Sequence, residues 1–281
     1  MNENLTRQVD TNFVILNNQL IRVEEAKISI NDRGLLLGEG LFETMIFGVN
    51  GLQNLMLHWQ RLQATAKKIG LFLPLTVNQL QRNAADLINE YKHFPCGMRL
   101  TITGGIAERG LAARSEKGGD YFLSCFKLPQ IKQAWRLTLS SVRLAPYNYY
   151  SGIKSLSYLH SVLVKREALD KGFDDGIFLT HSGELAETSC ANLFFIRNNI
   201  VITAPISSGI LPGTVRARVF EICYQFGIVI EERAVAIEEI EDMEAGFITN
   251  ALIGVVPIDS IDKQALNEHP IIDKVQSFLT R

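Results

Sequence analysis

Residues 175–205 contain four short apolar runs separated by turn signals, and this pattern limits the possible folds more than any other in the chain. The runs read DGIFLTH, LAETSC, NLFFIRNN and IVITAP, with turns at HSG and RNN. Such spacing is typical of β-strands joined by tight turns. Helical patterns stand before and after these strands in the sequence, over residues 158–172 and 214–227. The mixture predicts an α/β (α+β) fold.

The helix predicted before these strands has the sequence YLHSVLVKREALDKG. Its periodicity gathers four apolar side chains on one face, and Gly172 marks its end. The four apolar side chains are those of Leu159, Val162, Leu163 and Leu169.

The first part of the chain shows the same mixture of helices and strands. A helix is predicted from apolar residues at helical spacing, namely Leu55, Trp59, Leu62, Ala66 and Ile69. A second helix should begin near Thr76, because Thr76 and Gln79 have the spacing of a capping box. The segment KLPQIKQAW resembles a connector. We therefore expect a smaller N-terminal α/β domain over residues 1–128, a connector over 129–134 and a larger C-terminal domain over 135–281.

The composition argues against several classes of protein. Hydrophobic residues make up 47% and charged residues 21% of the 281 residues, which suits a globular chain with a sizeable core. The net charge of −2 gives no electrostatic reason to expect nucleic acid or a membrane as partner. No apolar run approaches the roughly 20 residues of a membrane span. The five histidines do not cluster, so no metal site is expected. Four cysteines far apart and a first segment without a signal-peptide pattern favour a reduced, cytoplasmic protein.

Three charged residues and one turn could carry chemistry. Lys154 stands in a loop just before a helix, where a desolvated lysine can form imines. Glu187 precedes a cluster of small residues that would admit a bulky group, and it needs a cationic or proton-donating partner. The turn GILPGT opens a helix whose exposed N–H groups favour an anion such as phosphate. Taken singly, a lysine, a glutamate, an arginine such as Arg61 and a glycine turn are more often ordinary surface features.

Five stretches occur together in the order seen in one known family. From about residue 30 to residue 260 the chain resembles the fold-type IV pyridoxal-phosphate enzymes, which include D-amino-acid transaminases, branched-chain transaminases and 4-amino-4-deoxychorismate lyases. The matching stretches are DRGLLLGEGLFET (32–44), HWQRL (58–62), GIKSLSYL (152–159), ELAETSCANLFF (184–195) and GILPGTVR (209–216).

The resemblance assigns a role to each candidate. Lys154 matches the lysine that binds the cofactor covalently and later moves protons. Glu187 matches the glutamate that faces the pyridine nitrogen, and its negative charge would keep that nitrogen protonated. Arg61 matches the arginine that holds the phosphate. The other cofactor-binding positions implied are the N–H groups of Thr214 and Val215, together with Asn250, Ala251 and Tyr158.

Three places distinguish the members of the family. The segment ITNALIGVVPI (248–258) is similar to the lyases, whereas transaminases often have a phosphate-binding threonine where this chain has Ala251. The phosphate turn reads GTVR where transaminases usually read GITR, so Val215 can offer only its N–H. D-amino-acid transaminases place a histidine two residues after the arginine that matches Arg109, and here that position is Leu111. Arg109 is the candidate for a substrate carboxylate, and Phe42 is expected near the substrate.

The resemblance therefore favours a lyase that converts 4-amino-4-deoxychorismate to 4-aminobenzoate and pyruvate in folate biosynthesis. A class IV aminotransferase acting on D-amino acids or branched-chain amino acids is the alternative. A protein that binds the cofactor without turnover is a third reading, which the joint presence of Lys154, Glu187 and Arg61 disfavours. Members of the family are usually homodimers, so a homodimer is expected.

Overall fold

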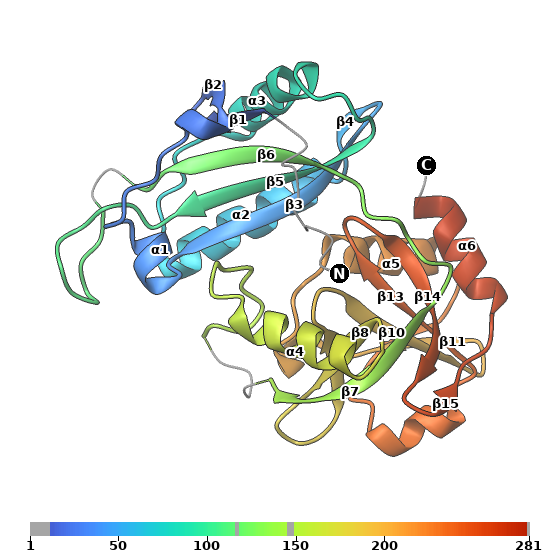
Figure 1. Cartoon of the computed structure of the whole chain (residues 1–281). Coiled ribbons are helices and arrows are strands. Elements are labelled where there is room, and N and C mark those ends of the chain that lie inside the picture. Colours follow the sequence, from blue (N-terminus) through green and yellow to red (C-terminus); the bar gives the residue numbers. More distant parts are fainter. Residues whose placement is uncertain (1–11, 116–117, 145–148, 280–281) are drawn as a thin grey trace, which may run out of the picture. The chain divides into compact units, whose positions relative to one another are not determined.

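The computed structural model describes residues 12–115, 118–144 and 149–279 (Figure 1). The first ten residues, on which the expectation about a signal peptide rests, lie outside these ranges. Two compact units divide the chain. The first consists of residues 1–129 and 154–157, and the second of residues 130–153 and 158–281. Both units combine helices and strands, so the predicted α/β (α+β) class is confirmed.

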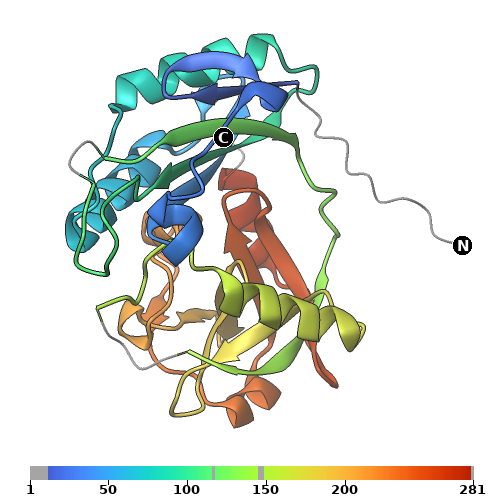
Figure 2. The same cartoon turned by 60° about the vertical axis from the view of Figure 1, so that its left-hand side comes forward.

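The first unit is an antiparallel sheet with helices packed against it (Figures 1 and 2). The strand order is β2-β1-β6-β5-β3-β4. The strands are β1 (Phe13–Leu16), β2 (Gln19–Arg22), β3 (Gly40–Gly48), β4 (Gly51–Leu52), β5 (Cys96–Thr103) and β6 (Tyr121–Lys127). The helical elements are η1 (Val23–Glu25), α1 (Arg33–Leu37), α2 (Leu55–Ile69) and α3 (Val77–Asn89).

The two long helices of this unit form where the sequence predicts them. The predicted apolar face of α2 is confirmed at Leu55, Trp59, Leu62 and Ala66, which are buried, whereas Ile69 at the end of the helix is half-buried. The capping box that opens α3 is also confirmed. The Thr76 hydroxyl accepts the Gln79 amide (3.3 Å), and the Gln79 side chain accepts the Thr76 amide (2.8 Å). Helix α1 was not predicted, because its five residues are too few to show a helical periodicity.

The second unit is built on a nine-stranded mixed sheet in the order β12-β11-β10-β13-β14-β7-β8-β9, with β15 on β14. The strands are β7 (Trp135–Arg143), β8 (Asp175–Leu179), β9 (Leu185–Thr188), β10 (Asn192–Arg197), β11 (Ile200–Thr203), β12 (Ile230–Glu232), β13 (Ala245–Asn250), β14 (Gly254–Ile261) and β15 (Gln264–Ala265). The helical elements are α4 (Leu159–Asp170), η2 (Ile206–Ser208), α5 (Thr214–Gln225), η3 (Ile237–Asp242) and α6 (Pro270–Leu279).

An additional pairing between β9 and β10 closes part of this sheet into a ring. The ring runs through β10, β13, β14, β7, β8 and β9 and returns to β10. The pairing is short and consists of Glu187 opposite Asn192. Alternate residues of β10 enter different cores, with Phe195 on one side and Phe194, stacked on Phe247 at 4.8 Å, on the other. Helices α5 and α6 cover the Phe194 side.

Helix α4 packs through a different face from its apolar one. All four residues of the predicted face are exposed, namely Leu159, Val162, Leu163 and Leu169. The buried residues are Ser161, Val164 and Ala168. The reason is close packing on β8, because a Cβ at Gly176 would lie 2.6 Å from Val164 Cγ1. Only small residues allow a helix to approach a strand so closely.

The residues that the structure describes include neither a membrane-spanning helix nor a cluster of metal-binding side chains. No helix within them combines the length and the apolar character needed to cross a membrane. Within the same ranges, no three His, Cys, Asp or Glu side chains come together as a group that could hold a metal ion.

Candidate active site

Lys154 lies on a segment that backbone contacts bind to strand β3. The Phe42 amide donates to the Lys154 carbonyl (3.1 Å), and Leu41 forms an antiparallel bridge with Ser155. These contacts place residues 154–157 with the first unit, whereas the sequence analysis counts them in the C-terminal domain. Lys154 Nζ is 4.4 Å from the centre of the Phe42 ring. The main chain thus holds the lysine in place, and its side chain extends over Phe42.

A second cation, Arg99, contacts the same aromatic ring. Its Cζ is 3.7 Å from the centre of the Phe42 ring. The register of β3 against β5 places Thr44 opposite Arg99 and Phe42 opposite Thr101, so Arg99 and Phe42 are diagonal neighbours on one face. Arg99 was not predicted as a site residue, because only the strand register brings it next to Phe42. A guanidinium next to the lysine is suited to a substrate carboxylate.

The buried carboxylate of Glu43 holds the Arg61 side chain. Arg61 Nε donates to Glu43 Oε1 (2.9 Å) and Arg61 Nη2 to Glu43 Oε2 (2.6 Å). His58 Nδ1 is 2.6 Å from Glu43 Oε2. Burial raises the pKa of Glu43, but the Arg61 charge and the hydrogen bonds from His58 and Arg61 outweigh it and hold that pKa at about 2. Burial lowers the pKa of His58, which favours a neutral imidazole donating from Nδ1. Glu43 and His58 were not predicted, although both stand within the matched stretches.

Replacing Glu43 by glutamine should destabilise the protein most at neutral pH. The folded pKa of about 2 lies below the ordinary 4.5. The carboxylate therefore contributes stability above pH 4.5, and this contribution is lost as the pH falls toward 2. The shift corresponds to on the order of 3 kcal/mol, and the variant also leaves the Arg61 charge uncompensated. Urea unfolding of Glu43→Gln and the parent protein should be measured from pH 7 to pH 3. The difference between their free energies of unfolding should become smaller below pH 4.5.

Glu167→Gln is the matched control for this experiment. Hydrogen bonds from Lys171 and Ser140 hold the pKa of Glu167 at about 2 as well, but the Glu167 and Lys171 side chains are 21% and 46% exposed, so solvent screens this pair in the second unit. Its pH-dependent contribution should be smaller, and the variant should leave cofactor affinity unchanged. Equal unfolding free energies for Glu43→Gln and the parent at pH 7 would contradict the account of Glu43.

Glu187 stands where β9 and β10 close the sheet of the second unit. Its carboxylate accepts the Leu211 amide at both oxygens (3.2 and 3.1 Å) and Asn192 Nδ2 at one (3.2 Å). Asn192 Nδ2 also donates to the Leu211 carbonyl (2.8 Å). Because the turn before α5 is hydrogen-bonded to Glu187 in this way, the carboxylate has a fixed orientation. Asn192 and Leu211 are the supporting residues that the sequence analysis did not name.

The first turn of α5 has the features of an anion site. The helix has twelve residues and begins at Thr214, and the N–H groups in the first turn of a helix point out of its N-terminal end. A Cβ at Gly213 would lie 2.0 Å from Asn192 Oδ1, which explains why glycine stands before the helix. The amides of Thr214 and Val215 therefore fit a phosphate group. This cradle and the fixed Glu187 carboxylate fit the two polar ends of pyridoxal phosphate.

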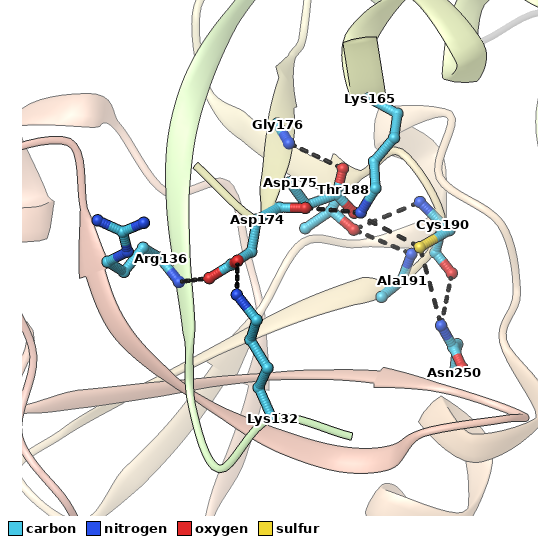
Figure 3. Close-up of polar contacts among 10 residues, drawn as sticks. All are labelled: Lys132, Arg136, Lys165, Asp174, Asp175, Gly176, Thr188, Cys190, Ala191 and Asn250. Carbon is cyan, nitrogen blue, oxygen red and sulfur yellow. Dashed lines mark hydrogen bonds and ion pairs between the residues drawn. The ribbon is translucent and has the colours of Figure 1, made fainter. Parts of the chain in front are cut away.

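The Asn250 side chain fixes a turn through three hydrogen bonds to the backbone. Asn250 Oδ1 accepts the amides of Leu252 (2.9 Å) and Ile253 (3.0 Å), and its Nδ2 donates to the Cys190 carbonyl (3.2 Å). In Figure 3 the Cys190 thiol in turn contacts the buried Asp175, at 3.4 Å from Oδ2. Asn250 thus sets the backbone of the turn at Ala251, and any contact of Ala251 with the cofactor stays a prediction.

The candidate residues are divided between the two units. Phe42, Arg61 and Lys154 belong to the first unit, as does Arg109, which is exposed on the loop after β5. Tyr158 is the N-terminal cap residue of α4. It belongs to the second unit, together with Glu187, Thr214, Val215, Asn250 and Ala251.

Comparison with known proteins places these features in a family context. The sequence profile described as Amino-transferase class IV matches residues 40–261. The D-alanine aminotransferase of Bacillus licheniformis is 26% identical over 270 residues, which cover 95% of each chain. The aminodeoxychorismate lyase of Bacillus subtilis is 25% identical over 260 residues, or 89% of this chain and 87% of that protein.

A solved structure gives a similar result at higher identity. The crystal structure of a provisionally named 4-amino-4-deoxychorismate lyase from Legionella pneumophila is similar with a TM-score of 0.85. The identity is 32%, and the match covers 92% of this chain and 96% of that one.

Proposed function

The chain belongs to the class IV aminotransferase family, whose members depend on pyridoxal phosphate, and from that premise we propose that it is a 4-amino-4-deoxychorismate lyase. The observation that carries the proposal is the side chain two residues after Arg109. Leu111 is 85% exposed there and cannot help to bind a carboxylate, as a histidine would in the D-amino-acid transaminases. The 32% identity to the Legionella protein supports the same choice.

The residues of the chain have separate tasks in this reaction. When bound, pyridoxal phosphate supplies an electron-withdrawing ring that stabilises negative charge on the carbon next to the substrate nitrogen. Glu187 would hold the proton of the ring nitrogen. The Lys154 amine, once released by the substrate amine, would take the proton from the substrate carbon that bears nitrogen.

The bond changes balance without another reactant. The electrons of the broken C–H bond enter the substrate ring, and the neighbouring C–O bond to the enolpyruvyl group breaks. The ring becomes aromatic as 4-aminobenzoate, and the departing enolate takes up a proton to give pyruvate. Arg99 and Arg109 are candidates for the two carboxylates of the substrate, because guanidinium groups bind carboxylates in a bidentate manner.

The test supplies 4-amino-4-deoxychorismate to the purified, cofactor-loaded protein and measures 4-aminobenzoate and pyruvate together. Equal amounts of both products are expected. Neither product, from protein that still shows the visible absorbance of bound cofactor, would overturn the lyase proposal.

An aminotransferase is the second candidate, and the D-alanine aminotransferase relative favours it. Lys154 and Glu187 would serve both reactions, since these diverge only after the shared proton removal. The two are distinguished by offering D-alanine and branched-chain amino acids together with 2-oxoglutarate. Glutamate formation without any 4-aminobenzoate would support the aminotransferase.

We also propose a homodimer. Helix α1 exposes Leu35 and Leu36 at 66% and 62% of their surface, and neighbouring exposed apolar side chains commonly mark protein contacts. A light-scattering mass near twice the 31.4 kDa of one chain is expected. A mass of one chain at micromolar concentration would contradict it.

A further inference from the structure

Arg33 is a buried arginine that binds a distant loop of the same unit. Its side chain is 7% exposed. Nη1 donates to the Gly110 carbonyl (2.8 Å), Nη2 donates to the Leu111 carbonyl (3.2 Å), and Nε donates to Glu39 Oε2 (2.5 Å). One guanidinium thus holds two consecutive carbonyls and a carboxylate. The loop that it holds, residues 104–111, is called here the Arg109 loop.

The local fold places Arg33 firmly before it reaches the loop. Asp32 is fully buried, caps α1 by accepting the Gly34 amide (2.6 Å) and accepts the Thr103 hydroxyl (2.7 Å). The Arg33 amide donates to the Gly105 carbonyl (2.9 Å). The base of the loop is therefore bound by backbone contacts, and its far end is bound by the Arg33 side chain.

Glu39 connects this arrangement to the strand that carries Phe42 and Glu43. The Gly104 amide donates to the Glu39 carbonyl (2.7 Å), while the Glu39 side chain holds Arg33 Nε. Glu39 immediately precedes β3. The Arg109 loop is thus bound, through Glu39 and Arg33, to the start of the strand beside Lys154.

We propose that Arg33 is a positioning residue that holds Arg109 ready for the substrate carboxylate. Arg109 itself is exposed and immediately precedes Gly110, whose carbonyl Arg33 holds. Without the Arg33 contacts the loop would sample other conformations, and binding would then have to order it at an entropic cost. The proposal rests on the assignment of Arg109 to a substrate carboxylate.

The chemistry requires arginine at this position. The planar fork of a guanidinium can donate to three acceptors in fixed directions. A lysine keeps the positive charge but is a point donor on a flexible stem, so it cannot hold both carbonyls and Glu39 in the same geometry. Arg33→Lys therefore removes the geometry and keeps the charge. Glu39→Gln leaves Arg33 intact and weakens only its orientation, which provides a milder second variant.

The test compares Arg33→Lys, Glu39→Gln and Arg109→Leu with the parent holoenzyme. Arg136→Lys is the matched control, because Arg136 also holds a backbone carbonyl, that of Gly172 (2.7 Å), in the other unit. Two readouts are combined. Steady-state kinetics with the amine substrate that the enzyme turns over give KM and kcat, and limited trypsin digestion measures cleavage after Arg109.

Arg33→Lys should raise KM about tenfold and leave kcat within about twofold, because loop order affects binding rather than the chemical step. Glu39→Gln should shift KM in the same direction by less. Cleavage after Arg109 should be faster in both variants, with cleavage outside residues 104–115 unchanged. In the Arg109→Leu background, Arg33→Lys should cause no further rise in KM. Arg136→Lys should match the parent in all readouts.

Two outcomes would overturn the proposal for different reasons. Unchanged cleavage after Arg109 in both Arg33→Lys and Glu39→Gln would show that Arg33 does not order the loop. The second outcome is faster cleavage after Arg109 in Arg33→Lys together with an unchanged KM in both Arg33→Lys and Arg109→Leu. It would show that Arg109 does not bind the substrate, and the carboxylate assignment would fall with it. The second outcome leaves the identity of the reaction open to the product assay, so the two failures are distinguishable.

Discussion

Replacing Lys154 by alanine is expected to abolish turnover, with kcat lower by about 10⁴-fold or more, because the variant loses both the covalent bond to the cofactor and the proton-moving amine. The contacts that hold this segment are made by the main chain. The Phe42 amide donates to the Lys154 carbonyl, and the bridge joins Leu41 and Ser155. Alanine preserves all of them. The loss should therefore be chemical, with the fold intact.

The measurement combines product formation with two structural readouts. Thermal unfolding of Lys154→Ala should match the parent without cofactor, and the visible absorbance of covalently bound cofactor should be absent. Lys132→Ala is the control, since Lys132 forms an exposed ion pair with Asp174 (2.5 Å) in the second unit. That variant should keep both activity and absorbance. Full turnover by Lys154→Ala would exclude Lys154 from the chemistry.

The sequence predicts those parts of the fold that depend on local patterns. The capping box at Thr76 and the apolar face of α2 are local, because their residues lie within one or two turns of each other. The fold class and family were likewise predictable, since five matched stretches stand in order. The domain limits predicted at residues 128–134 remain a prediction.

The face of α4 was not predictable in the same way. Its leucines have the periodicity of a packed face, yet Ser161, Val164 and Ala168 are buried. Periodicity shows that a helix is amphipathic, but which face packs depends on the partner. Here the partner is β8, where Gly176 allows a close approach that leucine side chains would prevent.

The supporting residues of the candidate site depend on register and on distant contacts. Arg99 contacts Phe42 from the neighbouring strand, although the two residues are 57 positions apart in the sequence. Arg33 reaches Gly110 and Leu111 at separations of 77 and 78 positions. Glu43 lies 18 positions from Arg61. Family resemblance made Arg61 and Lys154 candidates, but the sequence could not show which groups hold them.

Replacing Glu187 by glutamine is expected to lower kcat by about 10²- to 10⁴-fold, because a neutral side chain does not keep the cofactor's ring nitrogen protonated. The shape changes little. The amide oxygen of glutamine can still accept the Leu211 amide, which the carboxylate accepts at 3.1 and 3.2 Å. In the parent protein Asn192 Nδ2 donates to Glu187 Oε2 at 3.2 Å. In the variant the glutamine NH₂ group would stand there instead, so that two donors would face each other. A modest loss of stability, about 1 kcal/mol, should accompany the loss of activity.

Two further variants separate charge from structure at this position. Glu187→Asp keeps the negative charge but shortens the side chain, and it should retain more activity than Glu187→Gln if charge is what matters. Glu184→Gln, three residues earlier, is the control, because the Glu184 carboxylate bonds locally to the Thr180 hydroxyl. It should leave kcat and the spectrum of the bound cofactor unchanged. Equal activity for Glu187→Gln and the parent, with cofactor bound in both, would mean that ring protonation does not depend on Glu187. The short β9–β10 pairing at Glu187 and Asn192 would then serve only to close the sheet.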